Sequence, residues 1–148
     1  MRKRFYKFSK IGPQVAYALG LGPIIGRKIL LLTTTGRKTG LPRVTPLQYE
    51  EIDGCYYIGS AMGKRSDWYK NLEANPKVTV RVGRKIFQGV AETITDISQV
   101  ADFLEERLAR NPRMVGAILK VHGMPTRPTR AQIEAYSKNR AMVIIRPV

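Results

Sequence analysis

The chain has few of the residues that enzymes use for nucleophilic, acid–base or metal chemistry. Its 148 residues include one cysteine, Cys55, and one histidine, His122. A single cysteine excludes an intramolecular disulfide and fits a reducing compartment. These two residues cannot form a zinc site by themselves, so we expect no metal. Gly123, Pro125 and Pro128 surround His122 and indicate a loop, where we expect the imidazole to be structural.

Long hydrophobic runs are also absent. No apolar segment approaches the roughly 18 residues of a membrane-spanning helix, and Met1–Lys10 lacks the apolar core of a secretory signal. The sequence therefore predicts a cytoplasmic protein that is soluble or attached peripherally to a membrane.

Negative charge is scarce and unevenly distributed. The chain has 26 Lys+Arg against 11 Asp+Glu, a formal net charge of +15, and no acidic residue precedes Glu50. Such a balance predicts attraction to nucleic acid, anionic lipid or a polyanionic ligand. We expect the positive surface to belong to the first third of the chain.

One stretch concentrates this charge beside hydroxyl groups. Ile29 to Leu47 reads ILLLTTTGRKTGLPRVTPL, a buried strand followed by a basic turn and a second strand. The turn region gathers five hydroxyls and three cations: Thr33, Thr34, Thr35, Thr39, Thr45, Arg37, Lys38 and Arg43. Positive φ at Gly36 and Gly40 would let backbone N–H groups converge on an anion. The alternative is an ordinary hairpin with solvated cations, and the spacing is not that of a P-loop.

Alternating apolar residues and turn signals predict an α+β protein with about six mainly antiparallel strands in a closed or split barrel. Expected strands are Ile29–Thr35, Arg43–Glu51, Tyr56–Ser60, Val78–Val82, Ile86–Thr93 and Ala141–Ile145. Expected helices are Ser66–Ala74, one opened by Asp96 and ended by Asn111, Arg113–Val121, and one from Thr129 through Tyr136.

Two regions are predicted: an N-terminal basic arm, residues 1–28, and one domain, residues 29–148. The arm alternates cations with Phe5, Tyr6 and Phe8 and is expected to contain a short helix near Gln14–Leu19. It could lie on anionic lipid, or it could pack over the domain as a lid.

Three motifs in order resemble the deazaflavin-dependent nitroreductase and quinone reductase family. They are LLTTTGRKTGxPRxTPL, then DGxYYxxxS, then DWYxNLxANPxVTV, and they are followed by VAE and a late helix that contains a tyrosine. The resemblance covers roughly Ile29 to Glu92 in detail and the rest in outline. The resemblance implies a split β-barrel related to FMN-binding pyridoxamine oxidases, and coenzyme F-420 as cofactor. It further implies that Gly36, Arg37, Lys38, Thr39 and Arg43 hold the anionic tail, that Pro46, Leu47, Ser60 and Ala61 line the ring, and that Trp68 and Tyr69 lie beside it. The loop after Ser60 and the last strand depart from the family pattern.

A hydride-transfer enzyme needs no nucleophile or metal, because the cofactor supplies the chemistry. The absence of a Ser-His-Asp set or a carboxylate pair agrees with this. The expected acceptor is a planar electrophile, such as a quinone, nitroaromatic or enone. Tyr136 is the candidate to hydrogen-bond or protonate the acceptor, or it is only a packed wall; Tyr49 is a weaker candidate. Trp68 borders a ligand ring or fills the core.

Two alternatives stay open at this level. One keeps the fold and uses FMN, which has one phosphate and would leave several cations without partners. The other is a basic domain that binds anions or nucleic acid without catalysis; a compact Gly/Thr loop suits one phosphate better than an extended nucleic acid. By fold-level analogy the protein could also form a homodimer.

Overall fold

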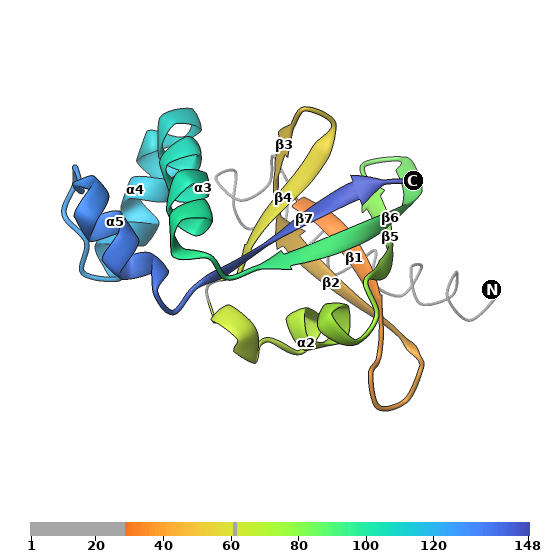
Figure 1. The fold of residues 1–148 in the computed structure, drawn as a ribbon. Helices are drawn as coiled ribbons and strands as arrows, with labels where there is room; N and C mark the ends of the chain where they lie inside the picture. The colour runs from red at the N-terminus through yellow and green to blue at the C-terminus, as the bar shows by residue number, and fades with distance from the viewer. Residues whose placement is uncertain (1–28, 61) are drawn as a thin grey trace.

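Seven strands form one antiparallel sheet in the computed structural model, which describes residues 29–60 and 62–148 (Figure 1). The strands are β1 (Ile29–Thr35), β2 (Pro42–Gln48), β3 (Glu50–Ile52), β4 (Cys55–Ser60), β5 (Lys77–Val82), β6 (Lys85–Ile94) and β7 (Ala141–Pro147). The helices are a 3-10 turn η1 (Gly63–Arg65), α2 (Asp67–Ala74), α3 (Ile97–Arg110), α4 (Pro112–Val121) and α5 (Arg130–Ser137). The predicted α+β class and antiparallel sheet are confirmed. The predicted arm at residues 1–28 lies outside the described residues.

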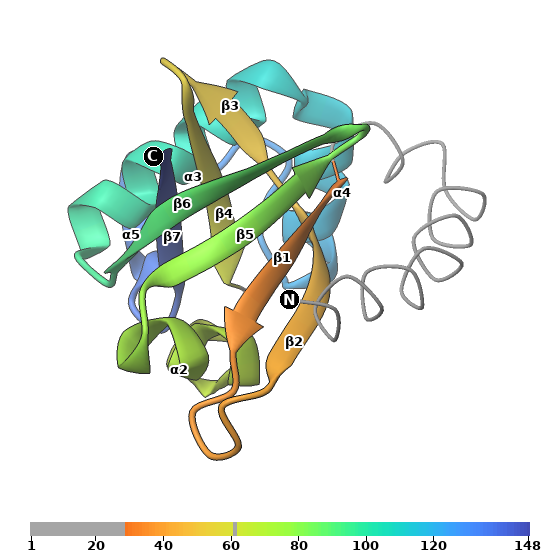
Figure 2. The ribbon, with the colours of Figure 1, turned by 90° about the vertical axis from the view of Figure 1, so that its right-hand side faces the viewer.

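The sheet has seven strands where about six were expected, because the expected second strand is two strands. Tyr49 separates β2 from β3, and these lie at opposite edges of the order β2-β1-β5-β6-β7-β4-β3. One residue can connect two opposite edges only if the sheet curls until they approach each other. The result is the open barrel seen in Figure 2. At this junction the Tyr49 ring contacts that of Tyr56, with centroids 5.5 Å apart.

Turn chemistry agrees with the sequence at the β3–β4 hairpin. Asp53 and Gly54 have φ of 51° and 79°. Two successive positive φ angles match the right-handed twist of a tight hairpin. The Asp-Gly pair therefore sets the register in which Ile52 pairs with Cys55.

Alternation along the central strand β7 divides the core in two. Ala141, Val143 and Ile145 belong to the larger cluster, which α2 joins through Tyr69 and Leu72. Met142 and Ile144 face the opposite way and pack with α3 residues such as Phe103. Because side chains of a strand alternate between faces, one strand serves both clusters. Figure 1 shows α2 at one end of the barrel and α3, α4 and α5 together on its outer side.

Two helices, α3 and α5, begin where a side chain accepts from a free backbone N–H group. Asp96 Oδ2 accepts from Gln99 N at 3.0 Å, and Thr129 forms a complete capping box with Gln132. Ser66 is the N-cap residue of α2, but its side chain makes no cap hydrogen bond.

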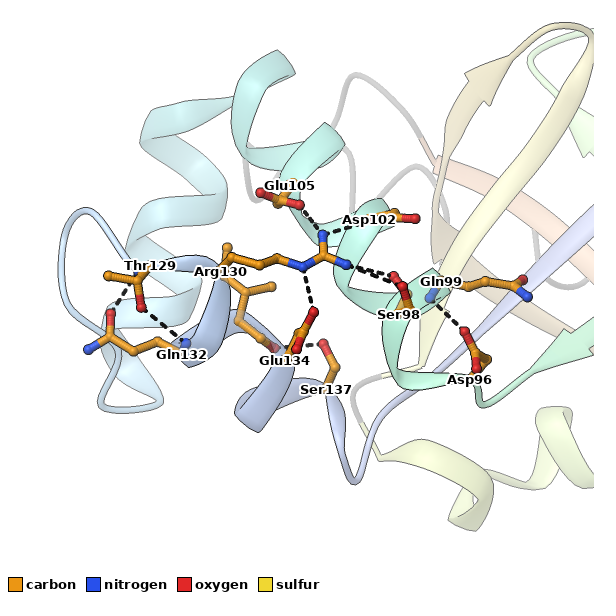
Figure 3. A network of polar contacts seen from close by, with 11 residues as sticks. Asp96, Ser98, Gln99, Asp102, Glu105, Thr129, Arg130, Gln132, Glu134 and Ser137 are labelled. Carbon is orange, nitrogen blue, oxygen red and sulfur yellow. Dashed lines mark hydrogen bonds and ion pairs between the residues drawn. The ribbon is translucent and has the colours of Figure 1, made fainter.

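Arg130 fastens α5 to α3, as Figure 3 shows. Its guanidinium pairs with Glu134 on its own helix and with Asp102 and Glu105 on α3, and it donates to Ser98 O at 3.2 Å. These acceptors raise the pKa of Arg130. The network keeps the helical layer together beside the barrel. No helix among residues 29–60 and 62–148 is long and apolar enough to cross a bilayer.

Candidate functional site

A cleft of about 460 Å³ lies between the β1–β2 turn and α2. Figure 2 shows the turn projecting past the end of the sheet beside this helix. The lining residues come from both segments: Gly36, Arg37, Lys38, Thr39, Arg43, Thr45, Asp67, Trp68 and Asn71. Six of the predicted cofactor residues therefore meet at one place, namely Gly36, Arg37, Lys38, Thr39, Arg43 and Trp68.

The two glycines of the turn serve different needs. Gly40 has φ of 72°, the left-handed conformation that glycine adopts without penalty. Gly36 does not have positive φ; a Cβ there would stand 2.9 Å from Thr39 Oγ1 and 3.1 Å from Leu41 O. The prediction of positive φ is thus right for Gly40 and wrong for Gly36, which is small because the turn folds tightly over it.

Several backbone N–H groups of the turn donate to acceptors of the protein itself. Gly36 N donates to Leu41 O and Gly40 N to Gly36 O, both at 2.8 Å, and Arg37 N donates to Asn71 Oδ1. Thr33 and Thr34 are buried in β1, at 3% and 1% exposure, so they do not face the cleft. Binding of an anion must therefore depend mainly on side chains.

Arg37 clamps the turn to α2. Its Nη1 donates to Asn71 Oδ1 at 2.9 Å, and its Nη2 pairs with Asp67 Oδ1 at 3.2 Å. Asn71 is 4% exposed and also donates to Thr34 Oγ1 at 3.3 Å. Asp67 and Asn71 are four residues apart, so they share one face of the helix. Sequence reasoning missed both roles, although the D-W-Y-x-N spacing was the available signal.

Lys38 and Arg43 are exposed at the cleft. Within the described part of the chain, which contains every Asp and Glu, neither forms an ion pair. Thr39 and Thr45 contribute hydroxyls beside them. The cleft is thus a concentration of cationic donors at one point of the surface.

The remaining predicted residues lie elsewhere. Pro46 and Leu47 follow Thr45 along β2 but do not line the cleft. Tyr69 faces the core and is 1% exposed. Burial raises the pKa of its hydroxyl, and a hydrogen bond with Thr93 lowers it by less. Ala61 lies outside the described residues. Adjacent positions of a helix point in directions about 100° apart, which explains why Trp68 borders the cleft and Tyr69 does not.

Ser60 and Tyr136 line a second, smaller cavity of about 90 Å³ between the sheet and α3–α5. Ser60 Oγ donates to Gly63 O at 2.7 Å. The Tyr136 hydroxyl is 2.7 Å from His122 Nδ1, the two rings are stacked, and Arg140 lies over Tyr136 at 4.3 Å. His122 is the C-cap residue of α4, in the turn that follows the helix, and there it has a specific partner that its sequence context did not indicate.

Strand β2 runs from the cleft toward the second cavity. Its first half borders the cleft at Arg43 and Thr45, and its last residue, Gln48, accepts a hydrogen bond from Arg107 of the second cavity at 3.2 Å. Gln48 lies five positions after Arg43 along the extended strand, a length of roughly 16 Å. An elongated ligand with one anionic end would find contacts along this strand.

The model of the F420H(2)-dependent quinone reductase family matches residues 11–115. The chain belongs to this family. Over 68 residues it is 43% identical to the F420H(2)-dependent quinone reductase Rv1261c of Mycobacterium tuberculosis, an alignment that covers 44% of this chain and 46% of that protein. The aligned region thus spans about half the length of the curated relative.

Solved structures agree on the fold. An F420-H2 dependent reductase (FDR-A) superposes with TM-score 0.53 at 23% identity, over 80% of this chain and 94% of that one. A putative pyridoxamine 5'-phosphate oxidase from Listeria innocua gives 0.55 at 14% identity, over 91% of each chain. The predicted split-barrel fold is confirmed.

Proposed function

We propose that this protein binds coenzyme F-420 and reduces a quinone by hydride transfer. The observation that carries the proposal is the cleft in which Lys38 and Arg43 stand without acidic partners in a chain of this family. The curated relatives are named as F420H(2)-dependent quinone reductases, but the aligned region spans only 46% of their length. The activity therefore needs its own test here.

The donor set of the cleft fits the anionic part of the cofactor. Lys38 and Arg43 would hold its phosphodiester and glutamate carboxylates, because ammonium and guanidinium groups bind such oxygens with charge-assisted hydrogen bonds. Thr39 and Thr45 would add hydroxyl donors. Arg37 has a second role, since its guanidinium already holds the turn against Asp67 and Asn71. FMN, with one phosphate, would use fewer of these donors.

Residues further along β2 would contact the planar ring. Pro46 is exposed and Leu47 half-buried on this strand, and both offer apolar surface. Ser60, the last residue of β4, would approach the ring from the second cavity, and Trp68 borders the cleft from α2. Ala61 is proposed for the ring on the resemblance alone. Tyr69 would act indirectly, by anchoring α2 in the core.

When bound, the reduced deazaflavin supplies the hydride. The protein's part is to orient the ring, to exclude water and to deliver a proton to the acceptor. Tyr136 is the candidate donor, because its hydroxyl is hydrogen-bonded to His122 Nδ1 at 2.7 Å and lines the cavity at the far end of β2. The alternative, that Tyr136 only packs against Arg140, predicts that Tyr136→Phe leaves turnover unchanged.

The deciding experiment is a binding titration of the purified protein with oxidised F-420 and, in parallel, with FMN. Lys38→Ala is expected to weaken F-420 binding by about 10- to 100-fold, the value of one charge-assisted hydrogen bond. Lys120→Ala, which removes an exposed lysine of α4 that does not line the cleft, is the matched control and should bind like the wild type.

If F-420 does not bind, or if Lys38→Ala and Lys120→Ala weaken it equally, the cleft is not the cofactor site. Tighter binding of FMN than of F-420 would favour the flavin alternative. Binding of neither would leave a basic anion-binding domain.

The proposal extends to other acceptors, to a membrane contact and to a homodimer. The acceptor could extend to nitroaromatics or enones, and residues 2–28 could bring the protein to an anionic membrane from a cytoplasmic location. One structural neighbour, 22% identical with a TM-score of 0.54, is described as a domain-swapped dimer, which supports a test for a homodimer by light scattering. Co-sedimentation with anionic vesicles tests the membrane contact.

A further inference from the structure

The second cavity contains two arginines that the proposed hydride transfer does not require. Arg107 of α3 and Arg140, just before β7, both line it and both are half-buried. Burial lowers the pKa of Arg107, against the attraction of Glu50 and Tyr136. Removing guanidinium groups from water costs free energy unless an anion or acceptors compensate.

Glu50 attracts Arg107, but no Asp or Glu of this chain, all of which the structure describes, forms an ion pair with either arginine. All eleven acidic residues lie between Glu50 and Glu134. Glu50, the acid whose charge acts on the pKa of Arg107, pairs with Arg110 and accepts a hydrogen bond from Asn111. Residues 1–28 and Ala61 include no Asp or Glu, so they supply no carboxylate either.

Neutral partners satisfy only part of the two guanidinium groups. Arg107 Nη2 donates to Gln48 Oε1 at 3.2 Å and its cation lies 5.8 Å from the Phe103 ring centroid. Arg140 stacks on Tyr136, but its Nε is buried with no hydrogen-bond partner in the described part of the chain. A buried donor without an acceptor is rare in native proteins and points to a missing partner.

The rest of the lining restricts what that partner is. Apolar side chains form most of the wall: Val100, Phe103, Leu104, Val115, Ile118 and Leu119. A volume of about 90 Å³ admits a compact group and excludes a nucleotide. Two guanidinium groups over an apolar wall match a carboxylate on a small hydrophobic body, and they suit a fully hydrated ion such as phosphate less well.

We propose that this cavity is a binding site for a small apolar organic acid, held by Arg107 and Arg140. The proposal does not depend on the identity of the cofactor. The acid could be an acceptor of the proposed reaction or a separate regulator. Either ligand would bind the two arginines through its carboxylate.

The test is calorimetric titration of the purified protein with benzoate as the probe. Benzamide, the neutral analogue, and inorganic phosphate, an anion without an apolar body, are the controls. Benzoate is expected to bind saturably and at least tenfold more tightly than either. Arg140→Gln should weaken benzoate by about 10- to 100-fold, because it removes charge-assisted hydrogen bonds. Arg113→Gln, an exposed arginine at the start of α4, should change nothing.

A second measurement does not depend on the stability of a variant. In NMR spectra of the wild type, the Nε–Hε signal of Arg140 should shift with benzoate and not with benzamide. Arg107→Lys, which keeps the charge but removes the planar fork, should bind more weakly than the wild type while retaining its melting temperature.

The proposal is overturned if benzoate does not bind, if benzamide or phosphate binds equally well, or if Arg113→Gln weakens binding as much as Arg140→Gln.

A second benzoate titration, on protein saturated with F-420, distinguishes the two sources of the acid. Retained binding supports a separate site, and competitive inhibition of quinone reduction by benzoate would identify the acceptor as the source. Loss of benzoate binding when F-420 is present would overturn the separate site and assign the cavity to the cofactor.

Discussion

Neighbouring threonines at the end of β1 differ in the hydrogen bonding of their buried hydroxyl groups. Thr33 Oγ1 is buried without a hydrogen-bond partner among the described residues, whereas Thr34 Oγ1 accepts from Asn71 Nδ2. Both side chains are almost fully buried, at 3% and 1% exposure. The two positions therefore separate the effect of a buried hydroxyl from the effect of its hydrogen bond.

We expect Thr33→Val to stabilise the protein by about 1 kcal/mol, because valine has the same shape and leaves no unsatisfied oxygen. Thr34→Val should destabilise it by about 1 kcal/mol, since Asn71 then loses an acceptor. Urea unfolding of the two variants beside the wild type measures both values. Equal effects of the same sign would contradict the assignment of hydrogen bonds at this site.

At the scale of elements, the cleft depends on the attachment of the β1–β2 turn to α2. Asn71 is the centre of this attachment, because it accepts from both the backbone and the guanidinium of Arg37. Its position on the buried face of a short helix makes the turn's conformation dependent on α2.

Asn71→Ala is expected to lower the free energy of unfolding by about 1–3 kcal/mol, the cost of leaving buried polar groups unpaired. It should also weaken F-420 binding, although Asn71 carries no charge, because the turn that holds Lys38 is no longer fixed. Lys70→Ala, an exposed neighbour on the same helix, is the control for both measurements. Unchanged affinity in a destabilised Asn71→Ala protein would show that the turn keeps its shape without the clamp.

At the scale of the whole molecule, folding keeps the hydroxyls of several tyrosines protonated to higher pH than in the unfolded chain. Burial raises the pKa of Tyr49, Tyr56 and Tyr69 above the ordinary value of 10.0. Below pH 10 these hydroxyls stay protonated in both folded and unfolded chains, so they add no pH dependence. Above it the unfolded chain loses protons first, and the free energy of unfolding falls as pH rises.

Urea unfolding at pH 8, 9.5 and 11 tests this expectation. The midpoint should change little between the first two values and fall at the third. Tyr69→Phe keeps the ring in the core and should make the loss at pH 11 smaller than in the wild type. A variant that loses as much stability as the wild type would show that Tyr69 is not one of the titrating groups.

Local patterns were sufficient to predict most elements. β-branched and aliphatic runs predicted the strands, Asp53-Gly54 predicted a hairpin, and Thr129 with Gln132 predicted the start of α5. These features depend on contacts within a few residues, which sequence spacing describes directly. The charge pattern and the threonine- and glycine-rich motif likewise located the cationic turn.

Long-range contacts decided the rest. The sequence does not show that Tyr49 divides a strand, because this depends on the curl of the whole sheet. Nor does it show that Arg37 pairs with Asp67, or that Arg107 and Arg140 share a cavity without an acid, because these partners are 30 or more residues apart. The sequence alone determined which elements form and where positive charge gathers, since both depend on local residue type. Only the tertiary structure decided which cations are neutralised, because pairing depends on distance in space.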